Sequence, residues 1–332
     1  MKDYLKAHYD EKIERVKKIN APLNFIFYTD PHNRLTEWDC PKHKDYAPDD
    51  YELAVDTIEG MRYLAEKLKI DCVVCGGDIG NDYNTDPVKE HEYFKEIMDA
   101  LYSLPVPVHC CIGNHDDCMM SHYYEPEGRR PMQECVLYPK DLHELCMKNN
   151  PTEENYYYTD FEELGYRFIF LNTSDFYYGF DENGKLIHPM TIELSHYQIQ
   201  WLAQALKTDK KVIIFSHAPI STKGIFGTPE VTNGPRTWRM LQKSPNVIAA
   251  FSGHVHYDFL VYDQNIVNIT TDAATGLEHG QWDPSCNWHE FGTHTESAFD
   301  VVSVTDKVIY LTRFGAGQDR VARILRGYME CL

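Results

Sequence analysis

The chain has 332 residues, of which 43% are hydrophobic and 25% charged, as in folded globular proteins. Its 32 lysines and arginines stand against 51 aspartates and glutamates, which gives a formal net charge of −19. This acidic balance argues against long nucleic acids and anionic membranes as partners, because both are bound through basic surfaces. No apolar run approaches the ~18 residues of a membrane span, and the first twenty residues are charged throughout, so we expect a cytoplasmic protein.

Helices and strands are expected to alternate along most of the chain. Amphipathic periodicity predicts helices at 2–20, 50–69, 87–102, 140–149, 194–206 and 235–243. Short apolar runs predict strands at 24–29, 71–76, 106–112, 211–216 and 246–252, and a hairpin at 155–171. This order favours an α/β protein with largely parallel central strands. From residue 258 onward, strands follow one another with short turns, and we expect an antiparallel meander there.

The ten cysteines are scattered along the chain and do not form the dense framework of a small disulfide-rich domain. Cys72 and Cys75 form a C-x-x-C pair, but they lie inside the apolar run DCVVC. We expect them to act as small hydrophobic residues in a buried strand. A zinc or redox role is the weaker alternative, since no second C-x-x-C pair completes a structural site.

Five of the predicted strands end in residue types that bind metals. The strand ends run into Asp30-Pro31-His32, Gly77-Asp78, Gly113-Asn114-His115-Asp116, His217 and Gly253-His254-Val255-His256. In open α/β sheets, sites form beyond the carboxyl ends of strands, so these five segments are expected to meet. Each one alone is weak evidence, because a single histidine at a strand end is more often an ordinary hydrogen-bonded residue. Their joint occurrence after five strands favours a metal site.

The types of these residues indicate which metals they would bind. Asp30 and His32 are spaced i, i+2, as are His254 and His256, so in extended backbone the two members of each pair project to the same side. The set contains nitrogen and oxygen donors and no thiolate. Such a set suits Mn, Fe, Zn or Ni better than a structural zinc.

This ordered set of motifs, over about residues 22–315, resembles the calcineurin-like metallophosphoesterase superfamily. The resemblance implies a four-layer α/β/β/α sandwich, with two mixed β-sheets flanked by helices and two metal ions at the edge. By the same resemblance, one metal would be bound by Asp30, His32 and His256, the other by Asn114, His217 and His254, and Asp78 would bridge both. His115 would be the general acid, oriented by Asp116.

Two departures from better-known branches bear on the function. Protein serine/threonine phosphatases of this superfamily carry G-D-x-x-D-R-G and G-N-H-E, whereas this chain has Gly77-Asp-Ile-Gly-Asn-Asp-Tyr83 and Gly113-Asn-His-Asp116. The missing arginine weakens a protein phosphatase assignment. Asn33 stands where a glycine often follows the histidine of D-x-H, which puts the local turn in doubt but not the ligands.

Long irregular stretches between the predicted elements are the candidates for substrate selection. Trp282 and Trp288 could stack on a base or sugar ring, although a loop held to the fold by its tryptophans explains them equally well. Arg129 and Arg130 could clamp a phosphate, although exposed arginine pairs are more often solvated surface.

Together these features predict an N-terminal helix (1–21) packed on a single phosphoesterase domain (22–332). The expected activity is hydrolysis of a small phosphate mono- or diester by a metal-bridging hydroxide, with two metal ions as cofactors. One alternative is a nuclease or cyclic-nucleotide phosphodiesterase on the same scaffold. Another is a catalytically inactive metal-binding scaffold for protein partners, which would have no need to keep His115.

Overall fold

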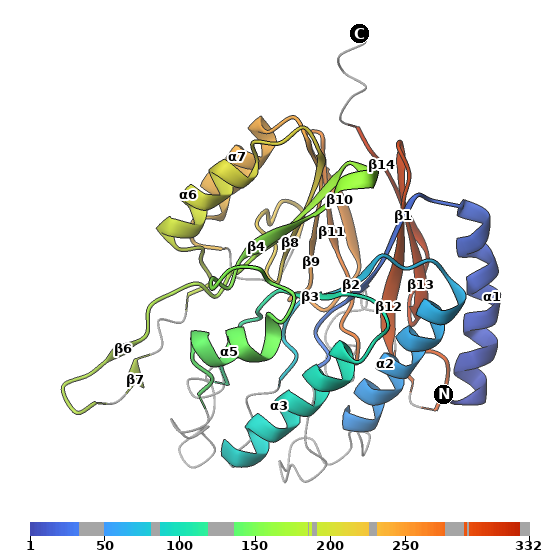
Figure 1. The fold of residues 1–332 in the computed structure, drawn as a ribbon, viewed down its shortest axis with the longest axis horizontal. Coiled ribbons are helices and arrows are strands. Elements are labelled where there is room, and N and C mark those ends of the chain that lie inside the picture. Colours follow the sequence, from blue (N-terminus) through green and yellow to red (C-terminus); the bar gives the residue numbers. More distant parts are fainter. Residues whose placement is uncertain are drawn as a thin grey trace.

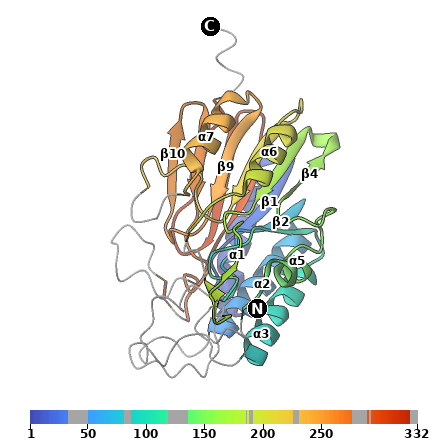
Figure 2. The ribbon, with the colours of Figure 1, turned by 90° about the vertical axis from the view of Figure 1, so that its left-hand side faces the viewer.

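Two six-stranded sheets form the centre of the molecule (Figures 1 and 2). The structure is a computed structural model that describes residues 1–32, 50–80, 87–118, 136–184, 186–187, 191–225, 231–275, 289–290 and 292–325. The first sheet has the order β14 (Arg320–Arg323), β13 (Val308–Gly315), β12 (Ala298–Val304), β1 (Leu23–Tyr28), β2 (Cys72–Cys75), β3 (Val108–Cys110). The second has the order β10 (Phe259–Asp263), β11 (Ile266–Thr270), β9 (Val247–Ser252), β8 (Lys211–Ser216), β5 (Tyr166–Leu171), β4 (Tyr157–Phe161).

Helices cover the outer face of each sheet (Figure 1). On the first sheet these are α1 (Asp3–Ile19), α2 (Asp50–Lys67) and α3 (Pro87–Tyr102), and on the second α6 (His196–Ala205) and α7 (Gly234–Lys243). The short helix α5 (Pro139–Cys146) contacts α3, and a 3₁₀ turn, η2 (Glu162–Leu164), joins β4 to β5. The predicted four-layer α/β/β/α sandwich is therefore confirmed. No helix in the described ranges is both long and apolar enough to span a bilayer.

Aromatic side chains fill the space between the two sheets. Phe25 on β1 of the first sheet lies 5.1 Å, ring centroid to centroid, from Phe168 on β5 of the second sheet. The same ring lies 5.5 Å from Phe215 on β8 and 5.5 Å from Phe251 on β9. Because successive residues of a strand face opposite sides, Phe25 and Phe27, two residues apart, both point from β1 toward the second sheet. These contacts fix the two sheets face to face.

The parallel strands place their carboxyl ends together. In the first sheet β1, β2 and β3 are parallel neighbours, and in the second β5, β8 and β9 are parallel neighbours. The motifs that follow β1, β2, β3, β8 and β9 therefore start at the carboxyl edges of the two packed sheets. The C-x-x-C pair lies in β2, where Cys72 and Cys75 are buried free thiols, as predicted.

The prediction of one antiparallel meander after residue 258 is wrong. The hairpin β10–β11 joins the second sheet, where β11 pairs with β9 in parallel. The strands β12, β13 and β14 pair antiparallel in the first sheet, with β12 next to β1. Apolar periodicity identified four of these strands, but it does not specify which strand each one pairs with. The pattern also missed β14 and the small hairpin β6 (Gly179–Phe180)–β7 (Leu186–Ile187).

Candidate metal centre

The structure brings the predicted ligand residues together at the sheet edge. Two groups of side chains each have ligand atoms within 4.8 Å of one another. The first group consists of Asp30, His32, Asp78 and His256, and the second of Asp78, His217 and His254. Asn114 joins the second group, because its Oδ1 lies 2.9 Å from His217 Nε2. All seven residues that the sequence nominated as metal ligands are thus close together.

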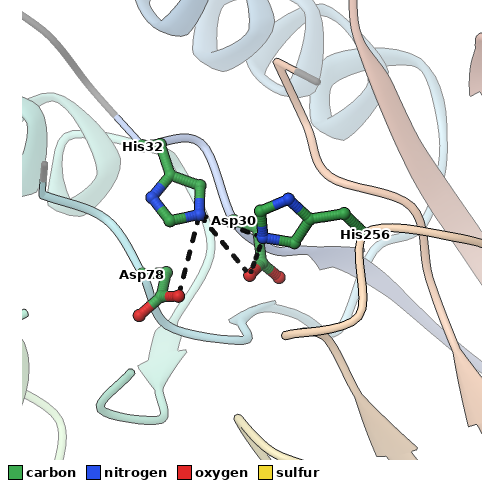
Figure 3. A group of neighbouring side chains, drawn as sticks. All are labelled: Asp30, His32, Asp78 and His256. Atoms are coloured by element: carbon green, nitrogen blue, oxygen red, sulfur yellow. Dashed lines mark hydrogen bonds and ion pairs between the residues drawn. The ribbon is translucent and has the colours of Figure 1, made fainter. Parts of the chain in front are cut away.

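In the first group, two histidine nitrogens face each other across a carboxylate (Figure 3). Nε2 of His32 and Nε2 of His256 are 3.0 Å apart. Asp30 Oδ1 lies 3.1 Å from the His256 nitrogen and 3.9 Å from the His32 nitrogen. The Asp30 carboxylate also accepts hydrogen bonds from the Thr29 hydroxyl and from the backbone N–H of His254. Three donor atoms, from the Asp30–His32 motif and from His256, therefore converge on one point.

In the second group, the orientation of the His217 ring is fixed by the backbone. Its Nδ1 lies 2.9 Å from the carbonyl oxygen of Gly76, which can only accept a hydrogen bond, so Nδ1 carries a proton. The other nitrogen, Nε2, lies 3.1 Å from Asp78 Oδ2 and 2.9 Å from Asn114 Oδ1. Metal-binding histidines commonly donate their second N–H to a carbonyl in this way.

Asp78 belongs to both groups. Its Oδ2 is 3.1 Å from Nε2 of His217 and 3.7 Å from Nε2 of His32. Its other oxygen, Oδ1, accepts a hydrogen bond of 2.9 Å from the backbone N–H of His115. This placement lets a single carboxylate contact ions held by either group.

The backbone around the centre is locally strained. Five of the seven candidate ligands have positive φ angles, which side-chain-bearing residues rarely adopt: Asp30 (51°), His32 (42°), Asp78 (52°), His254 (69°) and His256 (55°). Such conformations cost about 1–3 kcal/mol each and persist where surrounding contacts impose them, most often at functional sites. Two glycines of the motifs are required because ligand side chains lie against their Cα atoms. A Cβ at Gly113 would overlap the Asp78 side chain, and one at Gly253 would overlap the Asp30 carboxylate.

Burial and neighbouring charges shift the pKa values of the ligands in opposite directions. Burial alone would raise the pKa of Asp78, but the charges of His217 and His115 hold it well below its usual range. Burial would lower the pKa of His217, yet the charges of Asp78 and Asp30 raise it to about 9. Burial and the charge of His217 lower the pKa of His254 to about 3. One histidine therefore balances the buried carboxylates, while His254 stays neutral.

The donor set fits divalent transition-metal ions. Each group brings nitrogen and oxygen atoms that can offer lone pairs close to one another, as in the pair His32 Nε2 and His256 Nε2 at 3.0 Å. Such lone pairs repel unless a proton or a cation lies between them. No cysteine is among the two groups, which favours Mn, Fe, Zn or Ni over a structural zinc.

His115 lies beside the first group, whereas Asp116 does not act as predicted. The half-buried His115 ring packs edge-on against the His32 ring, with centroids 5.2 Å apart. The carboxylate of Asp116, which is fully buried, instead accepts four backbone N–H groups, from residues 78, 79, 80 and 113. Among the described residues, none of its hydrogen bonds goes to the His115 ring. Asp116 thus organises the turn that carries Asp78, and the prediction that it orients His115 is corrected.

The predicted substrate residues Arg129, Arg130, Trp282 and Trp288 lie outside the described residues, as does Asn33. Two supporting groups were not predicted from the sequence, the hydroxyl of Thr29 and the carbonyl of Gly76. Thr29 directly precedes the D-x-H motif, but threonine is common in strands and gave no separate signal. A backbone carbonyl is identified only once the fold brings it to its partner.

Comparison with known proteins agrees with this geometry. A family model for calcineurin-like phosphoesterases matches residues 23–258, which is more than half of the chain. The chain belongs to the calcineurin-like phosphoesterase family. The match spans every candidate ligand, from Asp30 to His256.

Solved structures show the same fold at low sequence identity. A dimetal phosphatase from Danio rerio is 16% identical, with a TM-score of 0.66 and coverage of 92% of this chain and 99% of that one. GAP50, the anchor in the inner membrane complex of Plasmodium, is 13% identical, with a TM-score of 0.51 and coverage of 91% and 89%. No curated protein sequence matches the chain. At these identities the neighbours establish the fold alone.

Proposed function

We propose that this calcineurin-like phosphoesterase uses two metal ions to hydrolyse a small phosphate mono- or diester. The observation that carries the proposal is the sharing of Asp78 by two adjacent ligand groups. One ion would be held by Asp30, His32 and His256, the other by Asn114, His217 and His254, with Asp78 in contact with both. The metals would be drawn from Mn, Fe, Zn and Ni.

Two bound divalent ions would supply Lewis acidity toward a phosphoryl oxygen and would lower the pKa of a bound water. The chain's own contribution is a rigid frame for these ions. Asp30 is fixed by Thr29 and by the backbone N–H of His254, and His217 by the carbonyl of Gly76. Because the two groups contain only two carboxylates, two divalent ions would leave the centre positive, and this charge would attract a phosphate.

His115 is the proposed proton donor for the leaving group. It lies beside the first group, with its backbone N–H bonded to Asp78 Oδ1 and its ring against His32. Its ring is half-buried, so it can reach both the centre and a substrate that enters from solvent. An imidazole titrates close to neutral pH, which suits protonation of a departing alkoxide.

The acidic surface limits the size of the substrate. A net charge of −19 repels an extended polyanion, whereas a small ester feels mainly the positive centre within the screening length of ~8–10 Å. We therefore favour a small ester over long DNA or RNA. The net charge does not argue against a small nucleotide, so a cyclic-nucleotide phosphodiesterase is the alternative that stays open. The loops that contain Arg129, Arg130, Trp282 and Trp288 are the candidates to recognise the group attached to the phosphate.

The direct test is turnover of 4-nitrophenyl phosphate and bis(4-nitrophenyl) phosphate by metal-free protein to which Mn²⁺, Fe²⁺, Zn²⁺ or Ni²⁺ is added separately. The proposal predicts hydrolysis with at least one metal and none with chelator. If the protein binds metal but turns over neither ester, no cyclic nucleotide and no oligonucleotide, the result would support the inactive scaffold instead. The relative rates on the two esters would decide between phosphatase and phosphodiesterase activity.

A further inference from the structure

A buried cluster of opposite charges lies outside the ligand groups. It consists of Asp258, Asp300, Arg313 and Arg320, and we call it the Arg–Asp cluster. The side chains of Arg313 and Asp300 are completely buried, and their Nε and Oδ1 atoms are 3.0 Å apart. Arg320 Nη1 lies 3.1 Å from Asp258 Oδ1, and its Nη2 contacts Asp300. The side chains of Arg320 and Asp258 are each 13% exposed, so two positive and two negative groups balance each other largely away from water.

The Arg–Asp cluster joins the two sheets. Asp300, Arg313 and Arg320 belong to β12, β13 and β14 of the first sheet, whereas Asp258 directly precedes β10 of the second. Arg320 also donates from Nη2 to the Thr271 hydroxyl at 3.1 Å, just beyond β11. The C-terminal strands therefore reach across the sandwich to the segment that follows His256.

The contacts of Asp258 converge on one atom. Its Oδ1 accepts hydrogen bonds from Nη2 of Arg313 at 2.5 Å and from the backbone N–H of Asp272 at 3.1 Å, in addition to the contact with Arg320. Removing that oxygen would leave the buried Arg313 guanidinium, the largely buried Arg320 guanidinium and a backbone N–H without this acceptor. Removing one partner of a buried ion pair lowers stability, because the remaining charge is left unpaired and away from water.

Asp258 lies at one end of the loop that carries two candidate ligands. The other end is held close to the centre, where the backbone N–H of Gly253 donates to His217 O at 3.0 Å and that of His254 donates to Asp30. His256, two residues before Asp258, has a strained φ of 55°. On its C-terminal side the carbonyl of Tyr257 accepts from the Thr270 hydroxyl at 2.8 Å, and Asp258 follows.

We propose that Asp258 is a positioning residue for His256, held by Arg313 and Arg320 so that the loop keeps the conformation that turns the His256 ring toward Asp30 and His32. His254 depends less on this anchor, because its own backbone is bonded to Asp30. The Arg–Asp cluster therefore supports the metal held by the first group more than the metal held by the second. This inference rests on the proposed function only where it treats the two groups as metal sites.

The test is stepwise Mn²⁺ binding to metal-free protein, measured by calorimetry and by electron paramagnetic resonance of the bound ions. Asp258→Ala should lower the affinity for one of the two ions by about 10- to 100-fold, as is typical when a group that supports a ligand is lost. The affinity for the other ion should stay within about threefold of the wild-type value. Asp258→Asn keeps an oxygen at the position of Oδ1 and should restore much of the affinity.

A matched control is Asp160→Ala. Asp160 forms a two-point contact with Arg167 (Nε to Oδ1 and Nη2 to Oδ2, both 2.7 Å) between β4 and β5, away from the ligands. This control should lower stability while both ions bind as in the wild type. Double variants identify the affected ion. Asp258→Ala should cause no further loss of Mn²⁺ affinity in a His256→Ala protein, and its full loss in a His217→Ala protein.

Equal weakening of both ions, or unchanged binding in folded Asp258→Ala protein, would overturn the proposal. If Asp258→Ala does not fold, Arg320→Gln removes one partner at the sheet edge, and it should weaken the same single ion; unchanged binding would then count against the proposal. Turnover is not the readout, so an enzyme inactive on every ester can still confirm or refute this role of Asp258.

Discussion

Replacing Asp116 by asparagine is expected to destabilise the protein, and the structure gives the magnitude. Asp116 Oδ2 accepts the backbone N–H groups of Gly113 (2.7 Å) and Asp78 (3.1 Å). Its Oδ1 accepts those of Ile79 (2.7 Å) and Gly80 (3.2 Å). An asparagine can satisfy only one of these two pairs, and its amide group would turn N–H donors toward the other pair.

Two buried N–H groups would then lack an acceptor, at about 1–3 kcal/mol each, so the expected loss is about 2–6 kcal/mol. Urea unfolding of the metal-free protein, followed by circular dichroism, measures this loss. Metal affinity should fall as well, because the turn that Asp116 holds carries Asp78.

Asp117→Asn provides a neighbouring control. Asp117 is also buried, but it accepts the Tyr178 hydroxyl, which an amide oxygen can still accept, so the loss should be smaller. If Asp116 acted only by orienting His115, Asp116→Asn would lower kcat while the free energy of unfolding stayed within about 0.5 kcal/mol of wild type. That result would refute the assignment of Asp116 to the Asp78 turn.

Four further predictions follow from the centre. Asp78→Asn should lower the affinity for both ions, measured as bound metal per chain after gel filtration, because both groups share this carboxylate; loss of one ion alone would contradict the sharing. His115→Ala should lower kcat by about 10²–10⁴-fold on esters with poor leaving groups, and less on nitrophenyl esters, with metal content unchanged; equal losses on both would exclude a proton-donor role. In the metal-free protein, the pKa of His217 is raised to about 9 by Asp78 and Asp30 against the opposing effect of burial, and its proton must leave before Nε2 can bind a metal. Affinity should therefore rise by roughly tenfold per pH unit between pH 7 and 9 and then level off, with proton release in calorimetry, and a flat profile would contradict this assignment. Finally, kcat/KM for a small diester should exceed that for single- and double-stranded oligonucleotides at physiological salt, and the reverse order would overturn the argument from net charge.

The sequence predicted the α/β class and the candidate ligands because both depend on local patterns. Short apolar runs identified β1, β2, β3, β8 and β9, and the polar residues directly after them were the candidate ligands. Parallel pairing then brings strand ends to one edge. The local residue patterns and the parallel pairing of the strands agree, and for this reason five short motifs, each weak alone, located one centre.

The remaining features depend on long-range contacts that no local pattern records. The apolar alternation of β12 is the same whether it pairs with β11 or with β1, so the division of the tail between two sheets could not be inferred. The resemblance suggested that Asp116 assists its neighbour His115, yet its carboxylate turns to backbone groups about 37 residues earlier in the chain. The Arg–Asp cluster joins residues from position 258 to 320, and nothing local distinguishes these charges from exposed ones.

The central claim is that two ions act together at one shared carboxylate. Metal-free protein should be titrated with Mn²⁺ while bound metal and turnover of bis(4-nitrophenyl) phosphate and 4-nitrophenyl phosphate are followed in the same samples. We predict that binding saturates near two ions per chain, that activity develops with the second ion, and that the resonance spectrum shows two coupled Mn²⁺ ions. Saturation at one ion per chain, or full turnover in the presence of excess chelator, would contradict this account.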